Sequence, residues 1–344
     1  RDYGDCLRRI LASPNVAEKS WIWTQYDHMV GTNTVERPGG DAAIVRIKGT
    51  SKALALKSDV NPFFCALDPY LGAAIAVAEA ARSLAATGAR PLAVTDCLNF
   101  GSPEKPEVMW QFAEAVRGIS EACAALSIPV VSGNVSFYNE TEGRPILPTP
   151  TIGMIGLLED AGKRVRTPFA DAGDLVALLG TTRDELGGSE YLRTVRGRDE
   201  GPCPQIDLEA ERRLVDLLVA LAVHRKLSSA HDLSDGGLAV ALAECAMRSG
   251  LGAEITLDGS LRPSALLFGE STGRALVTLP ASSRSAVEAS AAQIGVPLAL
   301  IGAVGGERLA ISVSGRTLID ESVASLSELW SGAFAKAIES ADLL

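Results

Sequence analysis

Two stretches of the chain decide its fold: residues 95–107 read TDCLNFGSPEKPE, and residues 132–140 read SGNVSFYNE. Each follows a short apolar run, which predicts one strand over 92–95 ending at Asp96 and another over 128–132 ending at Gly133. Between them, apolar side chains recur at steps of three and four residues, the spacing of one helix face: Val108, Phe112, Val116, Ile119, Cys123 and Leu126. If the two strands are parallel, both polar clusters emerge at the same sheet edge, where open α/β sheets bind ligands.

The rest of the chain predicts two domains that mix strands and helices, an α+β fold class. Residues 42–48 and 53–57 fit a hairpin, and an alanine-rich helix is expected over 72–86. A polar segment over 159–174 separates the halves, so we place the domains at 1–162 and 163–344. In the second half we expect helices over 208–225, 235–248 and 322–337, with strands over 175–179, 253–257, 275–279, 298–301 and 309–313.

Composition excludes several classes of function. With 32 basic and 42 acidic residues the net charge is −10, which disfavours binding to the phosphate backbone of nucleic acid. The longest strongly apolar stretch, 214–223, is too short for a membrane span and contains Asp216. The six cysteines form no C-x-x-C pair, so we expect reduced thiols, no zinc site and a cytoplasmic protein.

The residue types at the two strand ends suit a particular ligand. Asp96, Asn134 and Ser136 offer a carboxylate, an amide carbonyl and a hydroxyl, the hard oxygens that bind Mg²⁺ together with substrate phosphates. Gly133 would let a phosphate or ribose approach the backbone closely. The pattern alone also fits a turn Asp and a turn Asn that satisfy their own backbone.

Two further motifs also leave two interpretations open. His231, close to Asp232 and Asp235, fits either an acid–base group or a structural histidine near a helix start. The run Gly187-Gly188-Ser189-Glu190 fits either an anion site at a helix N-terminus or an ordinary capped helix start.

The two opening stretches closely resemble phosphoribosylformylglycinamidine synthase, specifically its ATP-binding large subunit of the PurL type. Other matching segments are 25–27, 30–35, 67–69, 76–82, 186–191, 231–238 and 267–271. The family enzyme is an internal duplication, and this chain resembles its C-terminal half. The resemblance implies a two-domain fold like that of aminoimidazole ribonucleotide synthetase (PurM-like), with a barrel-forming N-terminal domain and an α/β C-terminal domain.

The resemblance also implies an activity and a set of roles. The family converts formylglycinamide ribonucleotide to formylglycinamidine ribonucleotide: ATP phosphorylates the formamide oxygen, and ammonia displaces the phosphate. On this alignment Asp96 and Gly133 contact ATP, Asn134 binds Mg²⁺ and Ser136 contacts the substrate. No catalytic residue is assigned, because the family's histidine motif lies in the first half and does not occur here. We therefore expect a carbon–nitrogen ligase that is inactive without the first half.

The expected partners follow from the same resemblance: a glutaminase subunit that supplies ammonia, a small accessory subunit, and either the missing first half or a second copy of this chain. Two alternatives stay open. One is a related ATP-dependent synthetase of the same superfamily, and the other is a non-catalytic module that binds nucleotide or acts as a scaffold.

Overall fold

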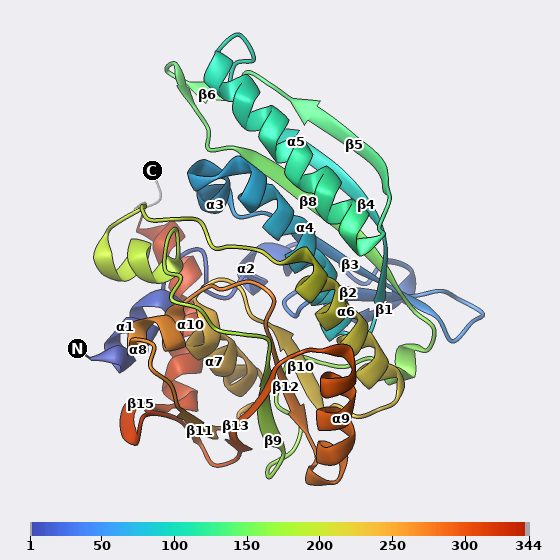
Figure 1. Cartoon of the computed structure of the whole chain (residues 1–344), viewed down its shortest axis with the longest axis vertical. Helices are drawn as coiled ribbons and strands as arrows, with labels where there is room; N and C mark the ends of the chain where they lie inside the picture. Colours follow the sequence, from blue (N-terminus) through green and yellow to red (C-terminus); the bar gives the residue numbers. More distant parts are fainter. Residues whose placement is uncertain (1, 341–344) are drawn as a thin grey trace.

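The computed structural model describes residues 2–340, which form two mixed sheets with helices packed on them (Figure 1). The first domain has a six-stranded sheet in the order β1-β2-β3-β8-β4-β5. Its elements are β1 (Thr34–Glu36), β2 (Ala43–Arg46), β3 (Ala53–Asp59), α3 (Pro62–Leu67), α4 (Pro69–Ala86), β4 (Arg90–Asn99), α5 (Pro106–Leu126), β5 (Val130–Ser136), the ribbon β6 (Glu140–Thr141) and β7 (Arg144–Pro145), and β8 (Thr149–Leu158). The predicted hairpin is confirmed, because β2 and β3 pair antiparallel.

The predicted strand–helix–strand unit is present, but its strands are longer than expected. β4 and β5 are parallel and adjacent, as the pattern required. The prediction that they end at Asp96 and Gly133 is wrong, since β4 continues to Asn99 and β5 to Ser136. The polar residues stay in the ladder because β8 pairs with β4 along its whole length and supplies backbone partners on the other side.

Helices α4 and α5 cover one face of this sheet (Figure 1). Almost every residue of α4 is buried, and its many alanines allow the sheet, α5 and α6 to approach it closely. On α5 the predicted stripe is correct except at Val116, which is 40% exposed, whereas Ala115 and Ala122 are buried. Gly118 lies so near the Tyr70 carbonyl that a side chain there would overlap it.

The second domain has a seven-stranded sheet in the order β10-β12-β9-β13-β11-β14-β15. Its strands are β9 (Leu175–Leu179), β10 (Ser229–Asp232), β11 (Ala253–Leu257), β12 (Ala275–Leu279), β13 (Leu298–Val304), β14 (Arg308–Val313) and β15 (Arg316–Ser322). Its helices are α6 (Leu208–Val223), α7 (Gly237–Ser249), α8 (Pro263–Phe268), α9 (Arg284–Ile294) and α10 (Val323–Glu339), with a π-helical turn at Tyr191–Arg196. Strands β1, β6, β7, β10 and β15 were not predicted.

Both faces of this second sheet are covered where β9 and β12 lie, so these two strands are buried along almost their whole length, whereas β11 alternates between buried and exposed residues. Ala177 and Leu179 face the core shared with α6, whereas Val176 and Leu178 face the core shared with α7 and α10. The expected α+β fold with two domains is confirmed. The boundary between 162 and 163 stays a prediction. Helix α1 (Tyr3–Leu11) precedes the first sheet in the sequence but packs against α7, α10 and β15 of the second domain.

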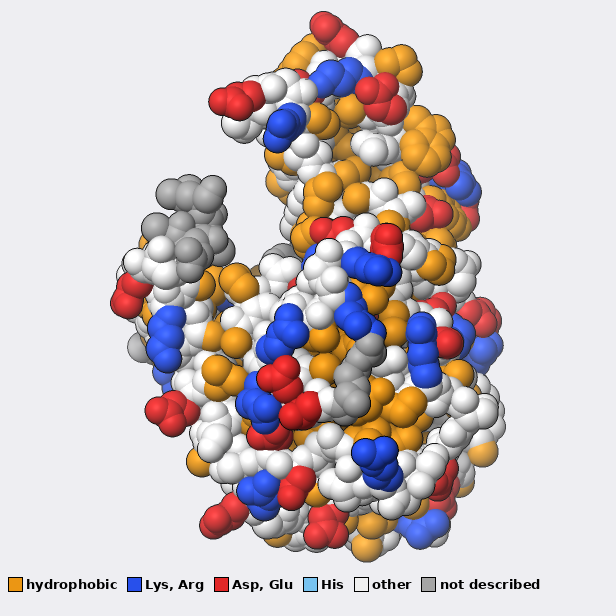
Figure 2. Space-filling view, turned by 90° about the vertical axis from the view of Figure 1, so that its left-hand side faces the viewer, with side chains coloured by type: hydrophobic (Ala, Val, Ile, Leu, Met, Phe, Trp, Pro, Cys, Tyr) orange, Lys and Arg blue, Asp and Glu red, His pale blue; other side chains and the backbone are white. Residues whose placement is uncertain are grey.

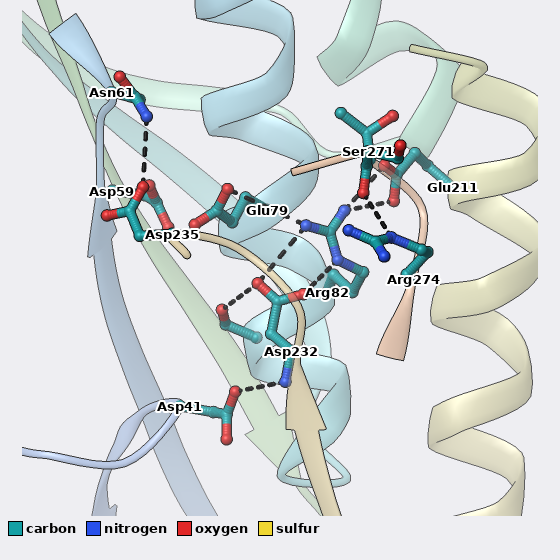
Figure 3. A network of polar contacts seen from close by, with 12 residues as sticks. Asp41, Asp59, Asn61, Glu79, Arg82, Glu211, Asp232, Asp235, Ser271 and Arg274 are labelled. Carbon is teal, nitrogen blue, oxygen red and sulfur yellow. Dashed lines mark hydrogen bonds and ion pairs between the residues drawn. The ribbon is translucent and has the colours of Figure 1, made fainter. Parts of the chain in front are cut away.

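A buried arginine joins the two domains (Figure 3). Arg82 of α4 is 1% exposed and donates through Nη1 to both carboxylate oxygens of Glu211 on α6, at 2.8 Å each. Its Nε donates to Asp232 of β10, whose other oxygen accepts from Ser83 at 3.4 Å. Loss of either carboxylate partner of a buried guanidinium strongly destabilises the folded protein, because a buried charge is left without compensation.

A second polar contact between the domains surrounds Asp41. Its carboxylate accepts from His231 Nδ1 at 3.0 Å, from the Asp232 backbone at 2.8 Å and from Thr167 at 2.5 Å. His231 Nε2 lies 3.0 Å from Glu244. Burial alone would lower the pKa of His231, but Asp41 and Glu244 raise it to about 10. Burial alone would raise the pKa of Asp41, but His231 lowers it to about 2. His231 is therefore a protonated structural histidine.

We expect Asp41→Asn to lower the free energy of unfolding by about 3–5 kcal/mol near pH 6, because it leaves a buried imidazolium without its carboxylate. A histidine whose pKa is raised on folding stabilises the folded state fully below its unfolded pKa of about 6.5. This stabilisation is lost as the pH rises toward the folded pKa of about 10. The cost of Asp41→Asn should therefore shrink between pH 6 and 9 in urea unfolding. The depressed pKa of Asp41 adds stability above about pH 4 that is lost as pH falls toward 2.

The matched control is Asp216→Asn, which breaks an exposed 3.2 Å contact with Arg90 and should cost less than about 1 kcal/mol at every pH. A cost of Asp41→Asn that is constant from pH 6 to 9 would contradict the assigned protonation of His231.

Candidate functional site

The four predicted site residues lie side by side in the neighbouring strands β4 and β5. In the parallel register Asp96 is opposite Gly133, Cys97 opposite Asn134, and Asn99 opposite Ser136. Neither Asp96 nor Asn134 lies in a turn or bonds to its own backbone through its side chain. The interpretation of these residues as turn-forming is therefore wrong.

Successive side chains of a strand point to opposite faces of the sheet. Asp96 and Gly133 therefore lie on one face, and Asn134 and Ser136 lie on the other. Asp96 shares the α5 face with the buried Val94 and Leu98. Asp96 also interacts electrostatically with Cys123 on α5. The pKa of Cys123 is raised to about 11, mainly by burial and in addition by the negative charge of Asp96. Asn134 lies on the other face, where its side chain contacts Cys97. The structure thus brings Asp96 to Gly133 and Asn134 toward Ser136, but separates the two pairs by the thickness of one sheet.

The edge position of β5 lets one ligand reach both faces. Among the described strands, β5 is hydrogen-bonded to β4 alone. At Gly133 a Cβ atom would overlap the Asp96 carboxylate, so the absence of a side chain leaves that carboxylate accessible. Partial burial raises the pKa of Asp96, and within residues 2–340 no side-chain or backbone donor reaches it. Asp96 is therefore available to accept from a ligand hydroxyl or amine.

The face away from the helices carries a row of polar side chains, which we call the open-face ladder: Thr95, Cys97, Asn99, Ser132, Asn134 and Ser136. Ser132 Oγ lies 2.7 Å from Thr95 Oγ1. Asn134 Nδ2 and Asn99 Nδ2 each lie 3.4 Å from Cys97 Sγ. The sequence predicted only Asn134 and Ser136 of this set, because the other side chains are recognised as neighbours only once the register is known.

Two loop residues hold the ends of β4 and β5 together. Asn139 donates through its amide to the Phe100 carbonyl at 3.0 Å and to the Ser136 carbonyl at 2.9 Å. Glu140 accepts from the Ser102 backbone at 3.0 Å and from Lys105 at 2.7 Å. Both residues belong to the stretch that opened the sequence analysis, but no spacing rule assigned them a role.

The donor set of the open-face ladder fits a metal that arrives with phosphates. It offers neutral amide and hydroxyl oxygens and no carboxylate. Mg²⁺ commonly binds through one or two protein groups, with waters and substrate phosphates completing its shell. Within residues 2–340, no group of three or more His, Cys, Asp or Glu side chains is arranged to hold a metal ion. Asn134 therefore fits a nucleotide-bound Mg²⁺, and the ladder is no dedicated metal cage.

A second cluster, which the sequence did not reveal, gathers acidic side chains between the domains (Figure 3). Asp59, Glu79 and Asp235 point toward one another, and Asn61 donates to Asp235 at 3.3 Å. Burial, with Glu190 and Asp59 nearby, raises the pKa of Asp235 to about 6, and burial and neighbouring carboxylates also raise the pKa of Glu79. Lys57 lies 3.5 Å from Asp59 and partly offsets the charge.

The run Gly187–Glu190 behaves as ordinary structure. Ser189 Oγ donates to the Leu186 carbonyl at 2.6 Å, and Glu190 accepts from Arg193. The short π-helical turn that follows, Tyr191–Arg196, presents no extended helix N-terminus. The anion-site interpretation therefore finds no support in these contacts.

Family models match both domains. Residues 39–158 match the model described as AIR synthase related protein, N-terminal domain, and residues 171–314 match that described as AIR synthase related protein, C-terminal domain. The protein of Alkaliphilus metalliredigens named phosphoribosylformylglycinamidine synthase subunit PurL is 48% identical over 340 residues, covering 99% of this chain and 46% of that protein. The chain thus spans about half the length of the curated relatives it matches.

Solved structures show the same fold. Thermotoga maritima PurL complexed with FGAR superposes with a TM-score of 0.77 at 19% identity, over 94% of this chain and 52% of that one. The same organism's PurL complexed with ATP gives 0.68 at 21% identity, over 83% and 46%. Its PurLQS structure gives 0.69 at 20% identity, also over 83% and 46%.

We expect Gly133→Ala to push a methyl group against the Asp96 carboxylate and so to desolvate it further. The pKa of Asp96 should rise beyond its already raised value, as measured by carbon-13 NMR of the carboxyl carbon during a pH titration. Gly305→Ala is the control, because open space surrounds Gly305 and its backbone is not left-handed. An unchanged titration of Asp96 in Gly133→Ala would show that the two residues do not share a face.

Proposed function

The chain belongs to the AIR synthase related family in both of its domains, and from this premise we propose that it is the C-terminal half of the PurL-type subunit of a phosphoribosylformylglycinamidine synthase. The observation that supports this most strongly is the placement of Asp96, Gly133, Asn134 and Ser136 in two adjacent strands with a free edge. The PurL of Thermotoga maritima has been solved with FGAR and with ATP, which supports the proposed substrates.

In the proposed reaction the γ-phosphoryl group of ATP passes to the formamide oxygen of formylglycinamide ribonucleotide, and ammonia then displaces the phosphate. This chain's residues bind and orient the reactants. The Asp96 carboxylate accepts from a nucleotide hydroxyl or amine, and Gly133 lets the nucleotide approach the backbone. Asn134 would hold Mg²⁺ through its amide oxygen, and the metal would neutralise phosphate charge during transfer. Ser136 can donate its hydroxyl to the substrate.

The open-face ladder itself holds no carboxylate that could act as a general base. The ladder contains no histidine, and His231 is protonated at neutral pH by its contacts with Asp41 and Glu244. A protonated imidazole cannot abstract a proton. We therefore propose that the other half of the enzyme supplies acid–base catalysis and that this chain alone makes no product.

The open face of the first sheet supports the proposed pairing with that other half. A groove of about 550 Å³ runs along it, lined by Leu56, Ser58, Thr95, Val131, Ser132, Gly153 and Ile155 among others. Leu56 is 44% and Val131 67% exposed, and the part of the molecule that carries β4 and β5 stands clear of the rest in Figure 2. We propose that the barrel-forming sheet of the first half, or of a second copy of this chain, covers this face.

Ammonia would come from a glutaminase subunit, with a small accessory subunit in the complex. The PurLQS structure of Thermotoga maritima supports an assembly of this kind. The described residues contain no helix long and apolar enough to cross a membrane.

We expect Asn134→Ala to weaken the binding of Mg·ATP about tenfold while changing the free energy of unfolding by less than about 1 kcal/mol, because Asn134 is exposed and its side chain has one hydrogen-bond partner. Isothermal titration of the chain with Mg·ATP and with ATP in EDTA measures the effect. Asn134→Asp is the matched variant, since it keeps an oxygen ligand and should retain Mg·ATP binding. Equal loss of affinity with and without Mg²⁺ would contradict the metal role.

We expect no turnover of ATP, formylglycinamide ribonucleotide and ammonium by the chain alone, and turnover once a first-half polypeptide is added. Leu56→Lys should prevent both the pairing and the turnover, because it places a charge in the groove. Val116→Lys is the control: Val116 is similarly exposed, but on the helix side. Sedimentation velocity follows the pairing. Full turnover by the chain alone would overturn the assignment to a half-enzyme, and pairing without turnover would favour a scaffold.

A further inference from the structure

Cys97 differs from the other five cysteines of the chain. Cys6, Cys65, Cys123, Cys203 and Cys245 are all buried, whereas Cys97 is partly exposed on the open face of the sheet. It stands directly opposite Asn134 in the parallel register, one residue after Asp96. Its thiol therefore borders the proposed nucleotide site without being one of the predicted site residues.

The sulfur of Cys97 lies between two side-chain amides. Asn134 donates from β5 at 3.4 Å, and Asn99 donates from two residues further along β4 at 3.4 Å. Asn99 is held a second time, because its amide also donates to the Cys97 carbonyl at 2.9 Å. For the Asn134 amide, the sulfur is the hydrogen-bond partner that the described residues provide.

In the structure this contact turns the NH₂ end of the Asn134 amide toward the sulfur. A primary amide carries its NH₂ group and its carbonyl oxygen on opposite sides of one carbon. With NH₂ directed at the sulfur, the oxygen is turned away from Cys97. A rotation by half a turn would present two N–H donors to a cation, which repel it. Within residues 2–340, the Asn134 side chain makes no other hydrogen bond that could hold it in this orientation.

We propose that Cys97 is a positioning residue of this site: its thiol fixes the Asn134 carboxamide with the oxygen outward, ready for the Mg²⁺ of a bound nucleotide. The inference rests on the proposed function for the identity of the ligand. Cys97 itself touches neither metal nor nucleotide in this arrangement. It acts as outer partners of metal ligands commonly do, by orienting the ligand group.

The size of sulfur suits the task. The sulfur atom is larger and more polarisable than a hydroxyl oxygen, and it accepts at a longer distance, as the two 3.4 Å contacts show. Cys97→Ser keeps an acceptor at this position with a shorter reach, whereas Cys97→Ala removes the acceptor entirely. The two variants therefore separate the loss of the contact from a change at the site.

The first measurement needs no ligand. In nitrogen-15 correlation spectra of the chain, the side-chain NH₂ signals of Asn134 and Asn99 are identified from their loss in Asn134→Asp and Asn99→Asp. Cys97→Ala should shift both pairs of signals, and Cys97→Ser should shift them less. The matched control is Thr95→Val, which removes the neighbouring ladder contact with Ser132 and should leave the Asn134 signals in place.

The second measurement is the affinity for Mg·ATP and for ATP in EDTA. Cys97→Ala should weaken Mg·ATP binding about tenfold and leave Mg-free ATP binding unchanged, with Cys97→Ser restoring most of the loss. Unshifted Asn134 signals in Cys97→Ala, or equal loss with and without Mg²⁺, overturns the inference. A wild-type chain that binds no Mg·ATP overturns the proposed function and the metal part of this inference. Wild-type binding that Cys97→Ala leaves intact overturns this inference alone.

Discussion

The burial of Arg82 between the two domains is the constraint on which the rest of the structure depends. A guanidinium removed from water must be matched by carboxylates, and these come from α6 and β10 of the other domain. Once Glu211 and Asp232 are fixed on Arg82, α4 is fixed against the second sheet. Asp232 also donates its backbone N–H to Asp41, so the loop before β2 is held by the same group. The position of the first sheet, and of the site on its edge, follows from this set of contacts.

In the proposed site, groups that could bind a ligand lie on both faces of one pair of strands, β4 and β5. The carboxylate of Asp96 sits among apolar neighbours on the α5 side, where partial burial raises its pKa. The amides of Asn99 and Asn134 sit on the open side, where exposed polar groups cost little. Gly133 has no side chain to cover the Asp96 carboxylate, so this carboxylate stays accessible beside the edge strand β5. One strand pair can therefore present a carboxylate and neutral oxygens to one ligand without placing them in contact.

The sequence predicted the elements of the site better than their orientation. The apolar stripe on α5 and the two flanking runs identified a strand–helix–strand unit and the strands that carry Asp96 and Asn134. The runs did not show that β4 and β5 continue through the polar residues. The hydropathy of the sequence drops at these residues, but the backbone pairing of the strands continues through them. Side-chain faces depend on register, and a bulge between Val94 and Thr95 shifts it, so the separation of Asp96 from Asn134 had no local signal. The acidic cluster of Asp59, Glu79 and Asp235 is assembled from three distant segments, and only tertiary packing brings them together.

The position of α1 has a consequence for how the molecule is made. This helix is synthesised before the first sheet, yet its packing surface includes β15 and α10, which follow the other strands and helices of the second domain along the chain. Val16 and Glu18 complete the contact through the backbone, one accepting from the Trp330 ring nitrogen and the other donating to the Trp330 carbonyl. During synthesis the apolar side of α1 is therefore not covered until β15 and α10 have been made, and the first sheet can assemble before that. Closure of the second domain around α1 then becomes a late, long-range folding step, slowed by the entropy of joining distant segments.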